Sequence, residues 1–156
     1  RLFDAVAALV SGRPRVRFEG QAAMTLEFAA HEAAGEPGAY PCPLVAGPPD
    51  GPALLDWGPL VEALLDELAR GVATTTVAAR FHEGLAAAVV AAARHVGAPT
   101  VALTGGCFQN RWLTERVNVL LTGAGFRVLL HREVPANDGG VSLGQAVIGA
   151  AAAAAG

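Results

Sequence analysis

Thr100-Val-Ala-Leu-Thr-Gly-Gly-Cys-Phe-Gln-Asn110 is the stretch that decides the fold. Its first four residues form a short apolar run typical of a buried strand, and the paired glycines Gly105 and Gly106 predict a turn. A helical pattern follows over Arg111–Leu121. Paired glycines let backbone N–H groups approach a ligand, and a helix N-terminus attracts negative charge. This strand, loop and helix are therefore predicted to bind a nucleotide.

A second strand and helix come directly afterwards. A strand is predicted over Arg127–Leu130 and a helix over Gly139–Ala155, with the loop Pro135-Ala-Asn-Asp138 between them. Strand and helix alternating at this spacing favour adjacent parallel strands joined by right-handed crossovers. The sequence therefore predicts an α/β protein with a parallel or mixed sheet flanked by helices.

The part of the chain before Thr100 is predicted to be mostly helical. Apolar residues at helical spacing predict helices over 2–10, 21–34, 59–70 and 75–96, each followed closely by a glycine. Between them, Arg15–Phe18 is expected to be extended, and Leu44–Val45 is expected to pair with Ala53–Trp57 as two short strands.

Composition excludes several classes of protein. Hydrophobic residues make up 53% of the chain, but no run approaches the roughly 20 apolar residues of a membrane span, so no membrane partner is expected. The net charge of -3 gives no general attraction for nucleic acid, and the cluster Arg13, Arg15 and Arg17 is interpreted as solvated. All 11 basic residues are arginine, which excludes a Walker-type phosphate loop and a lysine Schiff base.

The two cysteines bear on the cellular location of the protein, and the start of the chain bears on its length. Cys42 and Cys107 are too few and too far apart for a zinc cluster or a disulfide framework, and no signal peptide is visible. A reducing, cytoplasmic location is therefore expected. The chain opens at Arg1, without an initiator methionine and directly in a helical pattern, so it is expected to be a piece of a longer polypeptide.

Two loops are predicted at the carboxyl edge of the parallel strands, where open sheets bind ligands. In the first, the Asn110 carboxamide either contacts a ribose or phosphate, or Asn110 or Thr104 caps the following helix. In the second, Asp138 is either a metal ligand or a helix N-cap. A single aspartate does not hold a metal alone.

Cys107 supports a different hypothesis. A thiol at a helix N-terminus ionises readily, and His131 after the next strand would serve as its base in a Cys-His acyl-transfer enzyme. The alternative is a small core residue, because no third group that would orient His131 is evident. The other histidines are interpreted as packing or surface residues, with His31 paired to Glu27 on one helix face.

Five segments in this order resemble the C-terminal end of HypF-type carbamoyltransferases of NiFe-hydrogenase maturation. The resemblance covers nearly the whole chain and rests on Arg1-Leu-Phe-Asp-Ala-Val-Ala-Ala-Leu9, Phe18-Glu-Gly-Gln-Ala-Ala23, Ala79-Arg-Phe-His82, Leu103-Thr-Gly-Gly-Cys-Phe-Gln-Asn110 and Pro135-Ala-Asn-Asp-Gly-Gly-Val-Ser-Leu-Gly-Gln-Ala146.

The resemblance implies a fold and an activity. Residues 1–156 would be the second half of a TsaD-like domain with the actin-like ATPase (ASKHA, ribonuclease H-like) fold. In that family a YrdC-like domain makes carbamoyl-adenylate from carbamoyl phosphate and ATP. The TsaD-like domain then moves the carbamoyl group to the C-terminal cysteine of a HypE-type acceptor protein. The chain alone is expected to be inactive, because the YrdC-like domain, the first phosphate loop and the family's paired histidine metal ligands lie outside it.

The resemblance also implies site residues. It assigns nucleotide contacts for ATP or carbamoyl-adenylate to Asp4, Gly20, Gly105, Gly106 and Asn110, with the Asp4 carboxylate accepting from the ribose hydroxyls. It assigns Asp138 as the carboxylate ligand of a divalent metal, zinc or iron, near the phosphate. No catalytic side chain is assigned within this chain.

Cys107 departs from the family, which usually has an apolar residue there, and this favours a packing role. Two alternatives stay open: an O-carbamoyltransferase of natural-product biosynthesis, which shares the two transferase domains, and a non-catalytic half-domain that binds the acceptor protein. The forms Phe18-Glu-Gly-Gln-Ala-Ala and Asn137-Asp-Gly-Gly favour the HypF type over the first alternative. TsaD enzymes themselves normally have Pro-Gly-Gly near the second segment.

Overall fold

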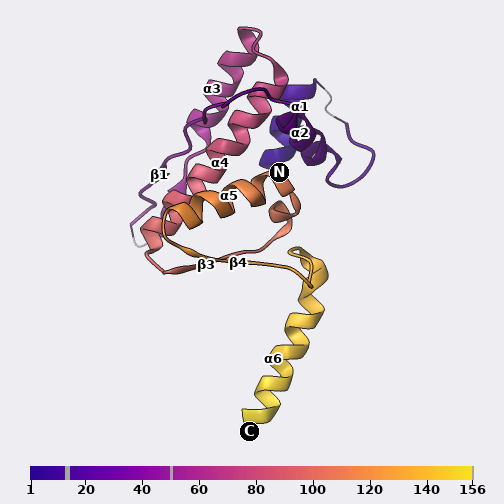
Figure 1. Cartoon of the computed structure of the whole chain (residues 1–156), viewed down its shortest axis with the longest axis vertical. Helices are drawn as coiled ribbons and strands as arrows, with labels where there is room; N and C mark the ends of the chain where they lie inside the picture. The colour runs from indigo at the N-terminus through magenta and orange to yellow at the C-terminus, as the bar shows by residue number, and fades with distance from the viewer. Residues whose placement is uncertain (13–14, 50, 156) are drawn as a thin grey trace.

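The structure, a computed structural model, describes residues 1–12, 15–49 and 51–155. The order of its helices and strands is the predicted one (Figure 1). The elements are α1 (Leu2–Ser11), α2 (Gln21–His31), β1 (Leu44–Val45), β2 (Leu54–Leu55), α3 (Gly58–Ala69), α4 (Thr74–Val96), β3 (Thr100–Leu103), α5 (Arg111–Gly123), β4 (Arg127–Leu130) and α6 (Val141–Ala155), with the short 3-10 helices η1 (Gly106–Gln109) and η2 (Asp138–Gly140).

Helix α4 forms the centre of the helical part, and α1, α2, α3 and α5 all contact it (Figure 1). Phe81 in α4 has no exposed surface, and its ring meets the ring of Phe3 in α1 edge-on with centroids 5.1 Å apart. Leu60 and Leu64 of α3 are equally buried in the same core. Apolar residues at helical spacing give α4 the continuous buried face that these helices cover.

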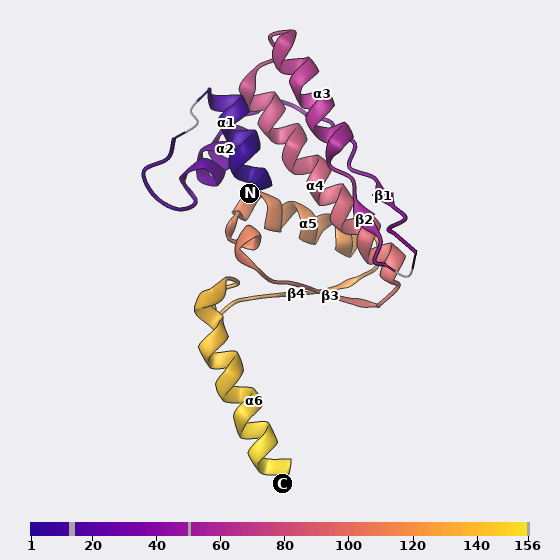
Figure 2. The same cartoon turned by 180° about the vertical axis from the view of Figure 1, so that it is seen from behind.

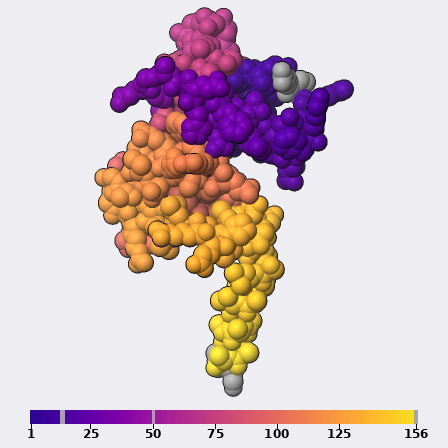
Figure 3. Space-filling model, turned by 45° about the vertical axis from the view of Figure 1, so that its right-hand side comes forward, coloured from indigo at the N-terminus to yellow at the C-terminus, as the bar shows by residue number. Residues whose placement is uncertain are grey.

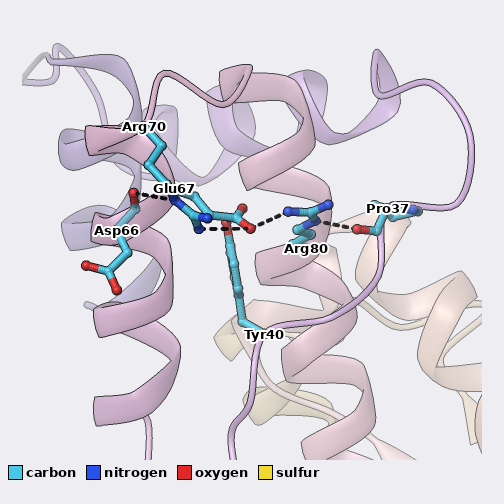
Figure 4. Close-up of polar contacts among 6 residues, drawn as sticks. All are labelled: Pro37, Tyr40, Asp66, Glu67, Arg70 and Arg80. Carbon is cyan, nitrogen blue, oxygen red and sulfur yellow. Dashed lines mark hydrogen bonds and ion pairs between the residues drawn. The ribbon is translucent and has the colours of Figure 1, made fainter.

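A polar network holds the segment before β1 against α3 and α4 (Figure 4). The Tyr40 hydroxyl donates a hydrogen bond of 2.6 Å to the Glu67 carboxylate of α3. Arg80 of α4 forms an ion pair with the same carboxylate, and its Nε also donates to the Pro37 carbonyl. The backbone crosses α4 so closely that a Cβ at Gly84 would lie 2.6 Å from the Tyr40 carbonyl oxygen. Only glycine fits at this crossing without a shift of the backbone.

Strands β3 and β4 pair in parallel, with Thr100 opposite Arg127 and Leu103 opposite Leu130. Helix α5 is the crossover that joins them, and its buried residue Val117 packs with α4 and the strands in a second core. The predicted parallel α/β unit is therefore confirmed. Strands β1 and β2 form a separate antiparallel pair, as predicted.

Helix α6 extends away from the rest of the molecule (Figures 1, 2 and 3). Its apolar side chains Leu143, Val147 and Ile148 are exposed, as is Leu129 on β4. Among the described residues no helix meets the length and hydropathy that a membrane span requires.

Some predicted boundaries differ from the structure. Arg15–Phe18, which is expected to be extended, is not part of a sheet, and the Arg17 N–H donates to the Gln21 side chain at 2.6 Å. The second short strand is confined to Leu54–Leu55, and α2 ends at His31, before the predicted residue 34. Arg15 and Arg17 are exposed as expected, whereas Arg13 lies outside the described residues.

Candidate functional site

The loops that follow β3 and β4 lie side by side at the carboxyl edge of the sheet. The Gly105 N–H donates a hydrogen bond of 2.7 Å to the Ala136 carbonyl, and the Thr104 hydroxyl approaches the same oxygen at 3.5 Å. Gly105 has φ 103°, a backbone conformation in which side chains are strongly disfavoured, so a glycine is required at this contact. The prediction that both loops meet at one edge is therefore confirmed.

A cleft of about 490 Å³ opens between these loops. Leu103 and Leu130 at the strand ends form its apolar floor, and Gln109, His131 and Arg132 supply polar groups. Glu133 also lines the cleft, so Arg132 and Glu133 contribute charges of both signs. Together with Gln109 and His131 they offer hydrogen-bonding groups that suit a polar ligand.

None of the site residues implied by the resemblance lines this cleft, but three of them are close in sequence to residues that do. Gly105 and Gly106 lie between its lining residues Leu103 and Phe108, and Asp138 comes two residues after Ala136, which also lines it.

The other implied positions, Asp4 and Gly20, lie on the helical part. Asp4 is exposed in the first turn of α1, and Gly20 precedes α2 with a left-handed φ of 79°. The start of α1 lies close to the start of α5, because the Phe3 ring and the Trp112 ring contact the same histidine, His82. Gly20 lies at the N-terminal end of α2, and the α2 contact with α5 is made further along the helix, at Glu27.

Asn110 is the N-cap of α5. Its Oδ1 accepts the Leu113 N–H at 2.8 Å, and only 7% of the residue is exposed. Of the two interpretations of Asn110, the structure shows the cap. A direct nucleotide contact by this side chain stays a prediction.

Glu27 of α2 contacts the start of α5, which its sequence does not predict. Its Oε1 accepts the N–H of Arg111 at 2.7 Å and the N–H of Trp112 at 3.3 Å, so a carboxylate of the protein itself sits at the N-terminus of α5. These two N–H groups are therefore already paired with an acceptor of the protein itself. No sequence signal indicates this contact, because the partners are 84 residues apart.

His82 of α4 is buried beside Asn110 and is also polar. It has no exposed surface, its Nδ1 lies 2.7 Å from the Ala78 carbonyl oxygen, and its Nε2 lies 2.9 Å from Asn110 Nδ2. Burial lowers the pKa of His82 below its usual value, outweighing the Ala78 contact and the charge of Glu27, which both raise it. The interpretation of His82 as a packing residue is confirmed in part, since its ring also takes part in a polar chain.

The lowered pKa of His82 predicts a pH dependence of stability. Below its usual pKa of about 6.5, unfolded His82 takes up a proton that the folded protein excludes. The free energy of unfolding should therefore fall as the pH drops from about 6.5 towards the folded pKa, by at most about 1.4 kcal/mol per pH unit from this group. Glu27 and His31, both on α2, are the ionisable groups whose charges act on the ring.

Urea denaturation of the wild type and of His82→Gln at several pH values measures how much His82 contributes to the pH dependence of the free energy of unfolding, because glutamine does not titrate. The wild type should lose more stability than the variant over the same pH interval. Parallel pH profiles would contradict the expected behaviour.

Asp138 opens the short helix η2 and is exposed, but its neighbour Asn137 is the N-cap, accepting the Gly139 N–H at 3.1 Å. The N-cap interpretation of Asp138 is therefore wrong. Within the described part of the chain, no group of three or more His, Cys, Asp and Glu side chains is placed to hold a metal ion. Asp138 alone does not make a metal site.

Cys107 and His131 are not joined by a hydrogen bond in the described structure. His131 lines the cleft, whereas Cys107 is an exposed residue of η1 and does not line it. The predicted packing role of Cys107 is wrong, because the 3-10 turn directs this position towards solvent.

Comparison with known proteins places this chain and its fold in a family. Residues 1–145 match the family model described as "Carbamoyltransferase, Kae1-like Domain, second subdomain". The chain is 38% identical to carbamoyltransferase HypF of Synechocystis and 42% identical to that of Rhodobacter capsulatus, and these matches cover 93% and 97% of it. It spans 18% and 19% of the two relatives, about a fifth of their length.

Solved structures agree with the sequence comparison. A full-length HypF crystallised in a phosphate- and nucleotide-bound form has a TM-score of 0.85 and 36% identity over 94% of this chain and 19% of its own. HypF of T. kodakarensis has a TM-score of 0.79 and 29% identity over 95% of this chain and 19% of its own. The chain therefore belongs to the HypF carbamoyltransferase family, in which it corresponds to the second subdomain of the Kae1-like domain.

Proposed function

We propose that this chain forms the nucleotide-contacting half of a carbamoyltransferase site that acts in hydrogenase maturation. It would hold ATP or carbamoyl-adenylate at the carboxyl edge of β3 and β4, for transfer of the carbamoyl group to the C-terminal cysteine of a HypE-type acceptor. The observation that carries the proposal is the cleft of about 490 Å³ between the two hydrogen-bonded loops. The nucleotide-bound HypF among the similar structures supports it.

Three groups of this chain have defined tasks in that site. Asp4 offers carboxylate oxygens to the ribose hydroxyls, since it is exposed at the start of α1. The backbone at Gly105 and Gly106 lets the nucleotide approach closely, because no side chain covers it. Arg132 in the cleft wall balances phosphate charge. Carbamoyl phosphate and the adenylation step would belong to other parts of the longer enzyme.

A divalent metal, zinc or iron, would take one carboxylate ligand from Asp138. The described residues do not complete such a site, so the remaining ligands would come from outside this chain.

Nucleotide binding by the chain itself tests the proposal. Isothermal titration calorimetry with the non-hydrolysable ATP analogue AMP-PNP should show saturable binding to the chain. Asp4→Asn should weaken it by about tenfold or more, because a hydrogen bond to a charged group contributes about 1.5–3 kcal/mol.

Asp66→Asn is the matched control, since Asp66 lies on α3 and its carbonyl, not its carboxylate, accepts from Arg70. It should bind like the wild type. Absence of saturable binding, or equal binding by Asp4→Asn and the wild type, would contradict the proposed function.

The non-catalytic alternative has a structural observation in its favour, the exposed apolar residues of α6. The same preparation mixed with a HypE-type acceptor distinguishes the two functions. Binding of the acceptor protein without any binding of AMP-PNP would favour a partner-binding half-domain.

A further inference from the structure

The hydrogen bonds around Asn110 fix where the protons of His82 lie. Leu113 N–H only donates, so the Asn110 atom 2.8 Å away must be the carbonyl oxygen Oδ1. Asn110 Nδ2 then faces His82 Nε2 at 2.9 Å, and because an amide nitrogen only donates, Nε2 must accept. A carbonyl only accepts, so Nδ1, 2.7 Å from the Ala78 oxygen, carries the proton. One assignment satisfies every contact: neutral His82 with its proton on Nδ1.

The surroundings of the ring hold it in this orientation. The rings of Phe3, Phe81 and Trp112 lie around it with centroid distances of 5.6, 5.5 and 5.2 Å. These three rings come from α1, α4 and α5, so three helices enclose the imidazole. Within the described residues no buried side-chain nitrogen or oxygen lacks a hydrogen-bond partner. A rotated ring would break two of these bonds where water has no access.

Through Asn110, His82 reaches the loop at the cleft. Asn110 follows η1 directly, and its own N–H donates to the Cys107 carbonyl at 3.2 Å. The Thr114 hydroxyl of α5 donates a hydrogen bond of 2.9 Å to the Phe108 carbonyl, and Phe108 lines the cleft. The position of the loop over Gly105–Gln109 therefore depends on the start of α5, and His82 holds that start from α4.

We infer that His82 is a positioning residue of the nucleotide site: its unprotonated Nε2 holds the Asn110 carboxamide and thereby sets the loop between β3 and α5. The expected effect of His82 on nucleotide binding rests on the proposed function, whereas the assignment of the proton to Nδ1 does not depend on it. No contact of His82 with a ligand is implied, because the ring is completely buried.

Two isosteres separate positioning from packing. Glutamine places its amide oxygen near the place of Nε2 and keeps the acceptor for Asn110, whereas asparagine reaches only the place of Nδ1 and leaves Asn110 Nδ2 unpaired. AMP-PNP binding to the full 156-residue chain should weaken by about tenfold or more in His82→Asn, as expected for a lost buried hydrogen bond, and by less than about threefold in His82→Gln.

Hydrogen exchange and NMR test the same inference without a nucleotide. In His82→Asn the Leu113 amide should exchange faster than in the wild type, and in His82→Gln it should stay protected. The wild-type imidazole 15N spectrum at neutral pH should show the proton on Nδ1 and a bare Nε2. A proton on Nε2, or equal losses of protection in both variants, would overturn the positioning role.

The two proposals fail in different ways. If the wild type binds no AMP-PNP, the nucleotide function fails, while exchange and the imidazole spectrum still decide the positioning role. If the wild type binds and His82→Asn binds equally well, the positioning role fails and the nucleotide function stands.

Discussion

Replacing Phe81 by alanine should lower the free energy of unfolding by about 3–5 kcal/mol, the range for removing a fully buried phenylalanine. The side chain has no exposed surface and lies in the middle of α4, where it packs edge-on against Phe3. Its loss would leave a cavity at the place where α1 meets α4. Urea denaturation followed by circular dichroism measures the change.

Phe28→Ala is the matched control for this prediction. Phe28 lies on α2 with 61% of its surface exposed, so its loss should change the free energy of unfolding by about 0.5 kcal/mol or less. If both variants lost the same amount of stability, Phe81 would not be at the centre of the core.

Gly84→Ala should cost about 2 kcal/mol of stability, although alanine favours a helix over glycine by about 1 kcal/mol. The added Cβ would lie 2.6 Å from the Tyr40 carbonyl oxygen and 3.3 Å from the Tyr40 backbone nitrogen. Backbone atoms cannot rotate away as a side chain does, so the whole crossing segment must shift from α4. The shift would also strain the hydrogen bond between Tyr40 and Glu67. Thermal unfolding compares the variant with the wild type.

Gly144→Ala provides the opposite case. Gly144 is also inside a helix, α6, but a Cβ there meets nothing within 4 Å. This variant should be as stable as the wild type or slightly more so. An unchanged or raised melting temperature in Gly84→Ala would mean that the close approach of Tyr40 to α4 does not occur in solution.

The features predicted from sequence are those encoded in neighbouring residues. The alternation over Thr100–Ala155 requires only apolar runs, glycine turns and the handedness of crossovers, and β3 and β4 are the adjacent parallel strands that it predicts. The adjacency of the two loops followed from that topology without any knowledge of their side chains.

The features that were missed depend on contacts between distant segments. Glu27 looked like the partner of His31 one turn away, but its carboxylate caps a helix far along the chain. His82 looked like a core histidine, and its link to Asn110 appears only when α4 and α5 cross. At η2 the error was local: Asn137 and Asp138 are both good capping residues, and sequence spacing does not say which one takes the cap.

The two caps of α5 also differ in when they can form during folding. The Asn110 cap joins residues 3 apart and is completed together with the first turn of the helix. The Glu27 contact closes a loop of 84 residues, so its entropic cost is met only after the intervening helices have assembled. We therefore expect helix α5 to start with its local cap and to gain the second one when α2 docks. The complete N-terminus of α5 is a product of tertiary assembly.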